Sequence, residues 1–172
     1  MLASQKIIDA FNVQIGNELG ASHQYIAIAS YFNGENLEQL SQFFFRQADE
    51  ERAHAMKFVK FVLDVGGKVE IPAVAAPRCD FQLAQEAVGM SLDWEREVTE
   101  QIYALVELCQ EERNHISMRF LDWFVTEQLE EVTVISNLLG VVERAGEGNL
   151  LYVEDYLSRH GIEGPDSVDA AG

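Results

Sequence analysis

A glutamate and a histidine lie three residues apart, as Glu51-x-x-His54, in the middle of a strongly amphipathic segment. At that spacing both side chains fall on one helix face, one turn apart, where they can bind the same metal ion. Apolar residues continue this face on both sides of the pair. In steps of three and four it comprises Leu37, Leu40, Phe44, Gln47, Glu51, His54, Phe58, Phe61 and Val65. A carboxylate inside a core must be neutralised, and a cation can do so.

A single Glu-x-x-His is a weak signal, because two common residue types recur at this spacing by chance. Three further glutamates strengthen it, since Glu18, Glu95 and Glu131 each interrupt the apolar face of another segment. Taken singly, each is better explained as a solvated surface charge. Taken together, they could form a hydrogen-bonded core network, but that network needs basic partners. None of the predicted inner faces contains Lys or Arg.

The sequence predicts four long helices and a short fifth one to position these residues. The first runs from Ser4, a plausible N-cap, to Asn33-Gly34, and the second from about Asn36 to Gly66-Gly67. The third follows Asp80 and ends near Cys109, a polar turn over 110–114 precedes the fourth, and the fifth spans about 149–159. The predicted inner face of the first helix comprises Ile8, Phe11, Ile15, Glu18, Ser22, Tyr25, Ala29 and Phe32. That of the third comprises Phe81, Ala84, Val88, Ser91, Glu95, Val98, Ile102, Leu105 and Cys109. That of the fourth comprises Ser117, Leu121, Phe124, Gln128, Glu131, Ile135, Leu138 and Val142.

The link between the second and third helices decides the topology. Residues 67–79 contain Pro72 and Pro77 and no helical pattern, so an extended link is expected. Thirteen extended residues reach about 43 Å, and a thirty-residue helix is about 45 Å long. The link can therefore run the length of the molecule and make these two helices parallel. The expected fold is all-α: a four-helix bundle with one long crossover.

The polar positions of the two helix pairs also match each other. Glu18 precedes Glu51 by 33 positions (51 − 18), and Glu95 precedes Gln128 by 33 positions (128 − 95). Four carboxylates and two divalent ions sum to zero charge, and oxygen ligands with one imidazole suit Mn, Fe or Zn. Tyr25 lies on the Glu18 face, where it could hydrogen-bond a ligand, donate an electron, or simply be a core tyrosine.

The composition narrows the class of protein. The 172-residue chain is 48% hydrophobic, enough for one domain with a sizeable core. Its net charge of −17 argues against nucleic-acid binding, which needs a basic surface. No apolar stretch is long enough to span a membrane, and Met1 to Lys6 has no signal-peptide core. Two isolated cysteines, Cys79 and Cys109, fit reduced thiols in a cytoplasmic protein.

Several motifs together resemble those of the bacterial non-haem ferritins, from about Ser4 to Arg159. They are Asn17-Glu18-Leu19, Tyr25-Ile26-Ala27, Glu50-Glu51-Arg52-Ala53-His54-Ala55, Trp94-Glu95 and Trp123-Phe124-Val125-Thr126-Glu127-Gln128-Leu129-Glu130-Glu131. The resemblance implies a ferritin-like di-iron domain over residues 1–160 with a short fifth helix, followed by a flexible tail over 161–172. It further implies ferroxidase activity, the oxidation of Fe(II) by O₂ or peroxide, and iron storage in a 24-subunit shell.

The resemblance also implies roles for individual residues. The first iron would be held by Glu18, Glu51 and His54, and the second by Glu51, Glu95 and Glu131, with Gln128 nearby. A third iron would lie among Glu50, Glu127, Glu130 and Glu131. Haem is not expected, because Arg52 occupies the position of the methionine that binds haem in bacterioferritins. Two alternatives stay open: a soluble di-iron peroxidase or oxygenase on the same bundle, and a DNA-protecting mini-ferritin.

Overall fold

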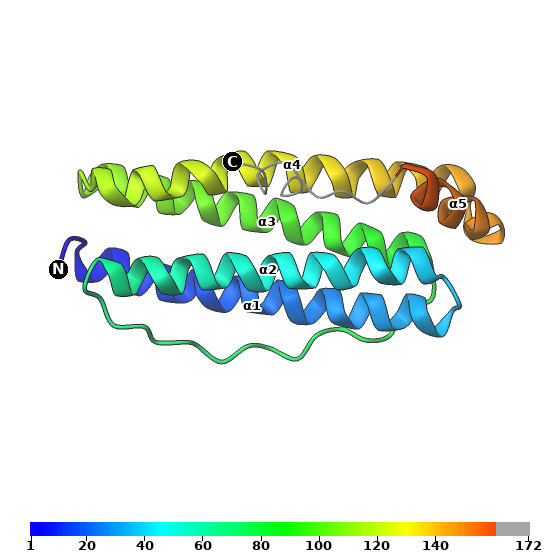
Figure 1. Cartoon of the computed structure of the whole chain (residues 1–172), viewed down its shortest axis with the longest axis horizontal. Helices are drawn as coiled ribbons and strands as arrows, with labels where there is room; N and C mark the ends of the chain where they lie inside the picture. The colour runs from blue at the N-terminus through cyan, green and yellow to red at the C-terminus, as the bar shows by residue number, and fades with distance from the viewer. Residues whose placement is uncertain (161–172) are drawn as a thin grey trace.

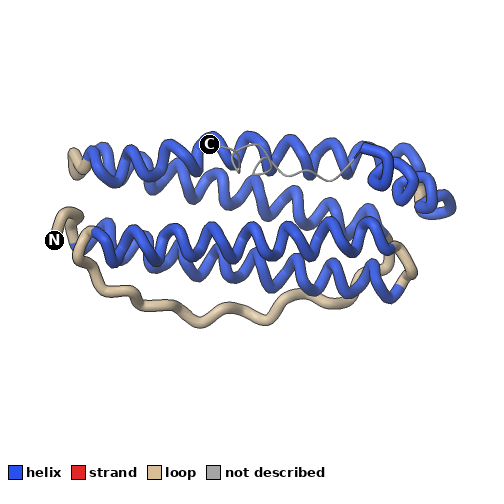
Figure 2. The backbone as a smooth tube through the Cα atoms, in the orientation of Figure 1, coloured by secondary structure: helices blue, strands red, loops and turns tan. Residues whose placement is uncertain are grey.

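The computed structural model describes residues 1–160 as a bundle of helices joined by loops (Figures 1 and 2). The elements in chain order are α1 (Gln5–Gly34), α2 (Glu38–Asp64), α3 (Ala84–Glu111), α4 (His115–Ala145), the 3-10 turn η1 (Glu147–Asn149) and α5 (Leu150–His160). The expected all-α architecture is confirmed, with helix ends within two residues of the predicted ones at most positions. The tail predicted over 161–172 lies outside the described residues.

Two antiparallel hairpins, α1–α2 and α3–α4, lie side by side, and α5 packs at one end of the bundle (Figure 1). The chain leaves α2 at one end, crosses the whole length of the bundle over residues 65–83, and enters α3 at the other end. The helices α2 and α3 therefore run parallel, as the length of the link predicts. This arrangement brings the middles of all four long helices to the same level.

Two side-chain amides of α1 hold the crossover against the bundle. Asn12 donates to the carbonyl oxygen of Lys68 at 3.0 Å and accepts from the backbone N–H of Glu70 at 3.1 Å. Gln24 pairs in the same way with both backbone groups of Arg78, at 2.8 and 2.9 Å. Each amide thus replaces the partners that an extended segment would find in a sheet.

The helix ends combine local and distant caps. Ser4 accepts from the backbone N–H of Ile7 and caps α1, as predicted, and Gly66 ends α2 with a positive φ of 80°. In contrast, α2 and α3 have leucine at the N-cap and no local side-chain cap. Their first N–H groups instead bond the carboxylates of Glu154 and Glu147, far along the chain. Carboxylates at these positions also complement the helix dipoles.

The residues predicted for the inner faces are buried, apart from the half-buried Phe61. Their apolar members form two separate clusters rather than one continuous core. One cluster holds Phe11, Phe58 and Phe124, and the other lies toward the α5 end and includes Phe32 and Phe44. Polar residues occupy the level between the clusters. No helix within residues 1–160 is both long and apolar enough to cross a membrane.

Candidate metal centre

Five glutamates and one histidine are buried at the polar level between the two apolar clusters. They are Glu18 on α1, Glu51 and His54 on α2, Glu95 on α3, and Glu127 and Glu131 on α4. Every long helix therefore contributes at least one carboxylate. The buried polar residues of the described chain include no Lys and no Arg. Since an uncompensated buried carboxylate is costly, this charge needs a positive partner from outside the chain.

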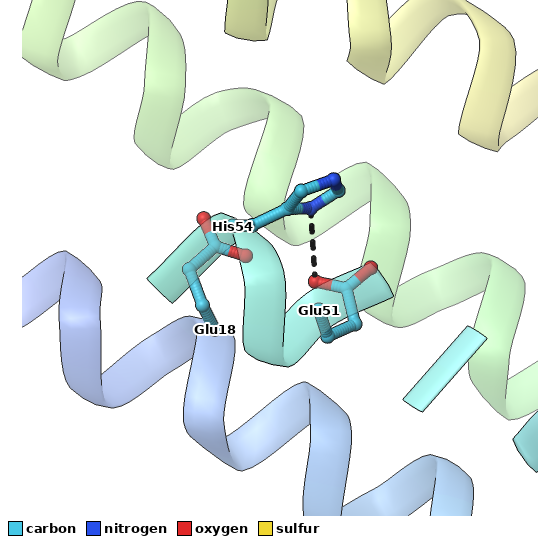
Figure 3. A group of neighbouring side chains, drawn as sticks. All are labelled: Glu18, Glu51 and His54. Atoms are coloured by element: carbon cyan, nitrogen blue, oxygen red, sulfur yellow. Dashed lines mark ion pairs between the residues drawn. The ribbon is translucent and has the colours of Figure 1, made fainter. Parts of the chain in front are cut away.

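The first group of potential ligands consists of Glu18, Glu51 and His54, as predicted from the sequence. Their ligand atoms all lie within 4.8 Å of one another, and all three side chains are buried. Glu18 reaches across from α1 toward the pair on α2 (Figure 3). Within the pair, Nδ1 of His54 lies 3.5 Å from Oε2 of Glu51. The one-turn spacing of Glu51 and His54 thus produces the convergence that the motif suggests.

A second group consists of His54, Glu127 and Glu131, whose ligand atoms also lie within 4.8 Å of one another. Nε2 of His54 is 3.7 Å from Oε1 of Glu127. The two ring nitrogens of His54 therefore face different carboxylates, one on α2 and one on α4. The resemblance implies Glu127 as a ligand of a third iron, and the structure buries its side chain beside His54.

Glu95 is fixed by hydrogen bonds rather than included in either group. The hydroxyl of Tyr25 donates to its Oε1, and the amide of Gln128 donates to its Oε2 at 3.2 Å. The same amide also lies 3.2 Å from the Thr99 hydroxyl, which itself donates to the Glu95 carbonyl oxygen. Tyr25 and Gln128 are therefore placed to orient a carboxylate. The second predicted set of ligands, Glu51, Glu95 and Glu131, does not come together as one group among the described residues.

Two residues in contact with the centre were missed by sequence reasoning. Gln14 is buried and donates to Oε1 of Glu18 at 2.9 Å, and Thr99 supports Gln128. Gln14 lies four residues before Glu18, one helical turn away, so helix spacing could have identified it. Thr99 is half-buried and lies one turn after Glu95, but nothing in its local sequence marks it.

Burial shifts the acid–base properties of the centre. Desolvation raises the pKa of Glu51 and of Glu131 well above the usual value, and the charge of Glu95 adds to both shifts. Desolvation likewise raises the pKa of Glu95 to about 7, although hydrogen bonds from Tyr25 and Gln128 oppose the rise. The protein alone therefore stabilises these groups poorly as anions.

Histidine and tyrosine respond to the same carboxylates. Burial alone would lower the pKa of His54, but its polar contacts with Glu127 and Glu51 and the charges of Glu51 and Glu18 raise this pKa well above its usual value. Burial and the neighbouring acids raise the pKa of Tyr25 well above 10, so its hydroxyl keeps its proton and remains a donor to Glu95.

Three buried carboxylate oxygens have no protein hydrogen-bond partner within the described chain. They are Oε2 of Glu18, Oε1 of Glu51 and Oε1 of Glu131. These unpartnered oxygens come from three helices and lie next to one imidazole, with no buried basic side chain among the described residues. Such a set of ligands matches the preference of Fe(II), Mn(II) or Zn(II). The residues therefore fit divalent metal ions.

The remaining predicted residues, Glu50 and Glu130, are half-buried. Glu50 accepts a hydrogen bond from the amide of Gln47, and its charge contributes to the raised pKa of Glu131. Glu50 thus lies near the α4 side of the centre.

Comparison with known proteins agrees with this geometry. The model of the ferritin-like domain matches residues 8–145. The chain is 43% identical over 146 residues to ferritin BfrB of Mycolicibacterium smegmatis, covering 85% of this chain and 80% of that protein. It is 35% identical over 153 residues to a bacterial non-heme ferritin of Staphylococcus aureus, covering 88% and 92%. An open pore ferritin from Archaeoglobus fulgidus superposes with a TM-score of 0.89 at 32% identity, covering 93% and 99%.

Proposed function

The chain belongs to the ferritin family, and we propose that it stores iron and oxidises Fe(II) at a di-iron centre inside each subunit. Family membership and the structural similarity support iron storage with ferroxidase activity in general. The observation that carries the assignment to this site is the set of buried carboxylates with open oxygens and no basic partner among residues 1–160.

In this proposal Glu18, Glu51 and His54 hold the first Fe(II). The second is held by Glu131 and Glu95, with Glu51 bridging the two ions. Glu127 lies close enough to His54 and Glu131 to serve as a further ligand of the second ion. Two divalent ions offset four carboxylates, which removes most of the electrostatic cost of the buried acids.

The chemistry needs both ions close together, so that one oxidant molecule takes one electron from each Fe(II). O₂ or hydrogen peroxide can serve as the oxidant. The protein contributes positioning and a water-poor surrounding, because the two apolar clusters close the centre from both ends. Tyr25 and Gln128 hold Glu95 in one orientation, and the hydroxyl of Tyr25 is close enough to the centre to supply an electron.

A third iron site would involve Glu50, Glu127, Glu130 and Glu131. The charges of Glu50 and Glu127 both contribute to the raised pKa of the buried Glu131, which supports this grouping. Crystals soaked in Fe(II) should show a third anomalous peak bounded by these side chains. A Glu50→Ala, Glu130→Ala variant should keep the initial two-iron oxidation and change later turnovers. Two peaks only, together with normal mineralisation by the variant, would remove this site from the proposal.

We also propose assembly into a 24-subunit shell, no haem, and a cytoplasmic location. The fifth helix buries Val153 and Leu157 against its own bundle, whereas Leu151 is 75% exposed. This exposed side of the helix is suited to contact with other subunits. The presence of α5 and the acidic net charge favour such a shell over a DNA-protecting mini-ferritin.

Arg52 is exposed and occupies the position of the methionine that binds haem in bacterioferritins, which favours the absence of haem. Two free cysteines fit a reducing compartment.

Titration with Fe(II) tests the function directly. Metal-free protein is loaded anaerobically with increasing Fe(II) and then exposed to O₂, and ferric absorbance is followed. We expect the amplitude of the rapid phase to saturate at two Fe(II) per chain. Saturation at one, or a rate equal to that of Fe(II) oxidation without protein, would exclude the di-iron centre.

A further inference from the structure

A chain of two side-chain amides leads from the outside of the bundle to Glu18. Asn17 donates from Nδ2 to Oε1 of Gln14 at 3.1 Å, and Gln14 donates from Nε2 to Oε1 of Glu18 at 2.9 Å. Gln14 and Glu18 are buried, whereas Asn17 is half-buried. Asn17 also lines a cavity of about 380 Å³ between α1, the crossover and α3. The first link is therefore near solvent, and the last is a candidate metal ligand.

The two hydrogen-bond partners of Gln14 agree on which end of its amide faces Glu18. A glutamine amide carries an acceptor oxygen and a donor nitrogen of almost equal shape, so its orientation follows from its partners. An ionised carboxylate only accepts, so the NH₂ group of Gln14 faces Glu18, and the oxygen of Gln14 then accepts from the NH₂ group of Asn17. The opposite orientation would set an amide oxygen against a carboxylate oxygen, which is repulsive.

The inner link divides the two oxygens of Glu18 between different tasks. Oε1 is taken by Gln14, while Oε2 has no protein hydrogen-bond partner in the described chain. Glu95 differs, because Tyr25 and Gln128 contact both of its oxygens. The Glu18 carboxylate is thus held by one oxygen and left open at the other.

We propose that Gln14 is a positioning residue, supported by a hydrogen bond from Asn17, that holds Glu18 so that a single oxygen is presented to the first metal ion. This role rests on the proposed function of the centre. Gln14 touches neither substrate in this account and acts only through Glu18. Groups that support metal ligands in this way typically change metal affinity about 10- to 100-fold when they are removed.

Three variants test the two links separately. Gln14→Met keeps the length of the side chain but removes the donor to Glu18. Asn17→Asp keeps the shape of Asn17 but replaces its donor with an acceptor, which competes with Glu18 for the NH₂ group of Gln14. Asn17→Leu removes the same donor without adding charge. The cavity beside position 17 leaves room for both replacements.

Co(II) is the probe, since its visible spectrum reports coordination number and it is added under nitrogen without oxidation. We expect the first Co(II) to bind about tenfold or more weakly to Gln14→Met and Asn17→Asp, with altered visible bands. Asn17→Leu should show a smaller effect in the same direction. In Fe(II) oxidation, the variants should raise the Fe(II) concentration needed for half-maximal rate more than they lower the maximal rate.

Asn12→Asp is the matched control, because Asn12 lies on the same helix and is buried, but bonds the crossover instead of the centre. It should lower the thermal midpoint and leave the Co(II) spectrum unchanged. Wild-type spectra and affinity in both Gln14→Met and Asn17→Leu would overturn the positioning role, even if Asn17→Asp were weakened by its charge. If the unmodified protein binds no Co(II), the proposed function fails and this inference falls with it.

Discussion

At the scale of single residues, the sequence could identify the acids of the centre but not their grouping. Helix spacing places Glu51 and His54 side by side, whereas the joining of Glu18 to this pair was implied only by the ferritin resemblance. Glu127 was expected only as a ligand of a third iron, and its carboxylate lies beside His54. Helix periodicity specifies the face on which a side chain lies, whereas ligand groups depend on rotamers and on contacts between helices. The contact of Gln14 with Glu18 follows from spacing, but the supporting hydrogen bond from Asn17 does not.

The raised pKa values predict how metal-free protein responds to pH. Glu51, Glu95 and Glu131 bind protons more tightly folded than unfolded, and His54 does so as well. For the three carboxyl groups this contribution to stability is full below the ordinary pKa of 4.5, and for His54 it is full below 6.5; each is lost as pH rises through the folded value of the group, about 7 for Glu95. For Glu95 alone the loss is on the order of 3 kcal/mol.

We expect the thermal midpoint of metal-free protein to fall between about pH 5 and about pH 8, measured by circular dichroism. Glu95→Gln should reduce this fall. Zn(II) should raise the midpoint most at the upper end of the range, where the carboxylates are ionised. A midpoint that does not change with pH, with or without Zn(II), would contradict the electrostatic account of the centre.

At the scale of elements, the sequence predicts the helices well because each buries a regular face. The parallel course of α2 and α3 follows from the length of the crossover alone. The starts of α2 and α3 were less predictable, since both are capped by carboxylates more than sixty residues away. No local sequence signal describes a distant cap. The contact between α1 and the crossover likewise depends on close packing, for example of Gly16 against the ring of Pro72.

Gly16→Ala should loosen the crossover. A Cβ atom at this position would overlap the ring of Pro72, and neither the helix nor the proline ring can yield easily. Overpacking of this kind costs about 1–3 kcal/mol, which corresponds to a midpoint lower by roughly 2–4 °C per kcal/mol in a chain of this size.

Gly140→Ala is the matched control, because a Cβ atom there meets nothing within 4 Å in the chain and the helix gains by about 0.5–1 kcal/mol. Differential scanning calorimetry of both variants should show opposite signs. Equal midpoints in the two variants would mean that the crossover does not press on α1 at Gly16.

At the scale of the whole molecule, one chain supplies all the acids of the centre, so the proposed oxidation would not require a partner subunit. The proposed storage would require one, because the bundle of residues 1–160 encloses no space for mineral. Several large apolar side chains stay exposed when a single chain folds. They include Leu151 and Tyr152 on α5 and Phe45 and Met56 on α2. A family-type shell would bury such surface between subunits.

The purified protein should therefore form a large closed particle. Taking 24 copies of a 19.3 kDa chain gives about 460 kDa. Multi-angle light scattering at micromolar concentration measures this mass without a shape assumption. A stable dimer would argue against storage and favour a soluble di-iron enzyme.

The central claim, that Glu51 bridges two irons during oxidation, is tested most directly by stopped-flow absorbance of Glu51→Ala. Glu107→Ala is the matched control, since Glu107 is an exposed acid on α3. Both variants are mixed with two Fe(II) per chain in aerobic buffer. The account predicts that Glu51→Ala loses the rapid ferric phase and keeps its helical content, while Glu107→Ala behaves as the unmodified protein. An unchanged rapid phase in Glu51→Ala would contradict it.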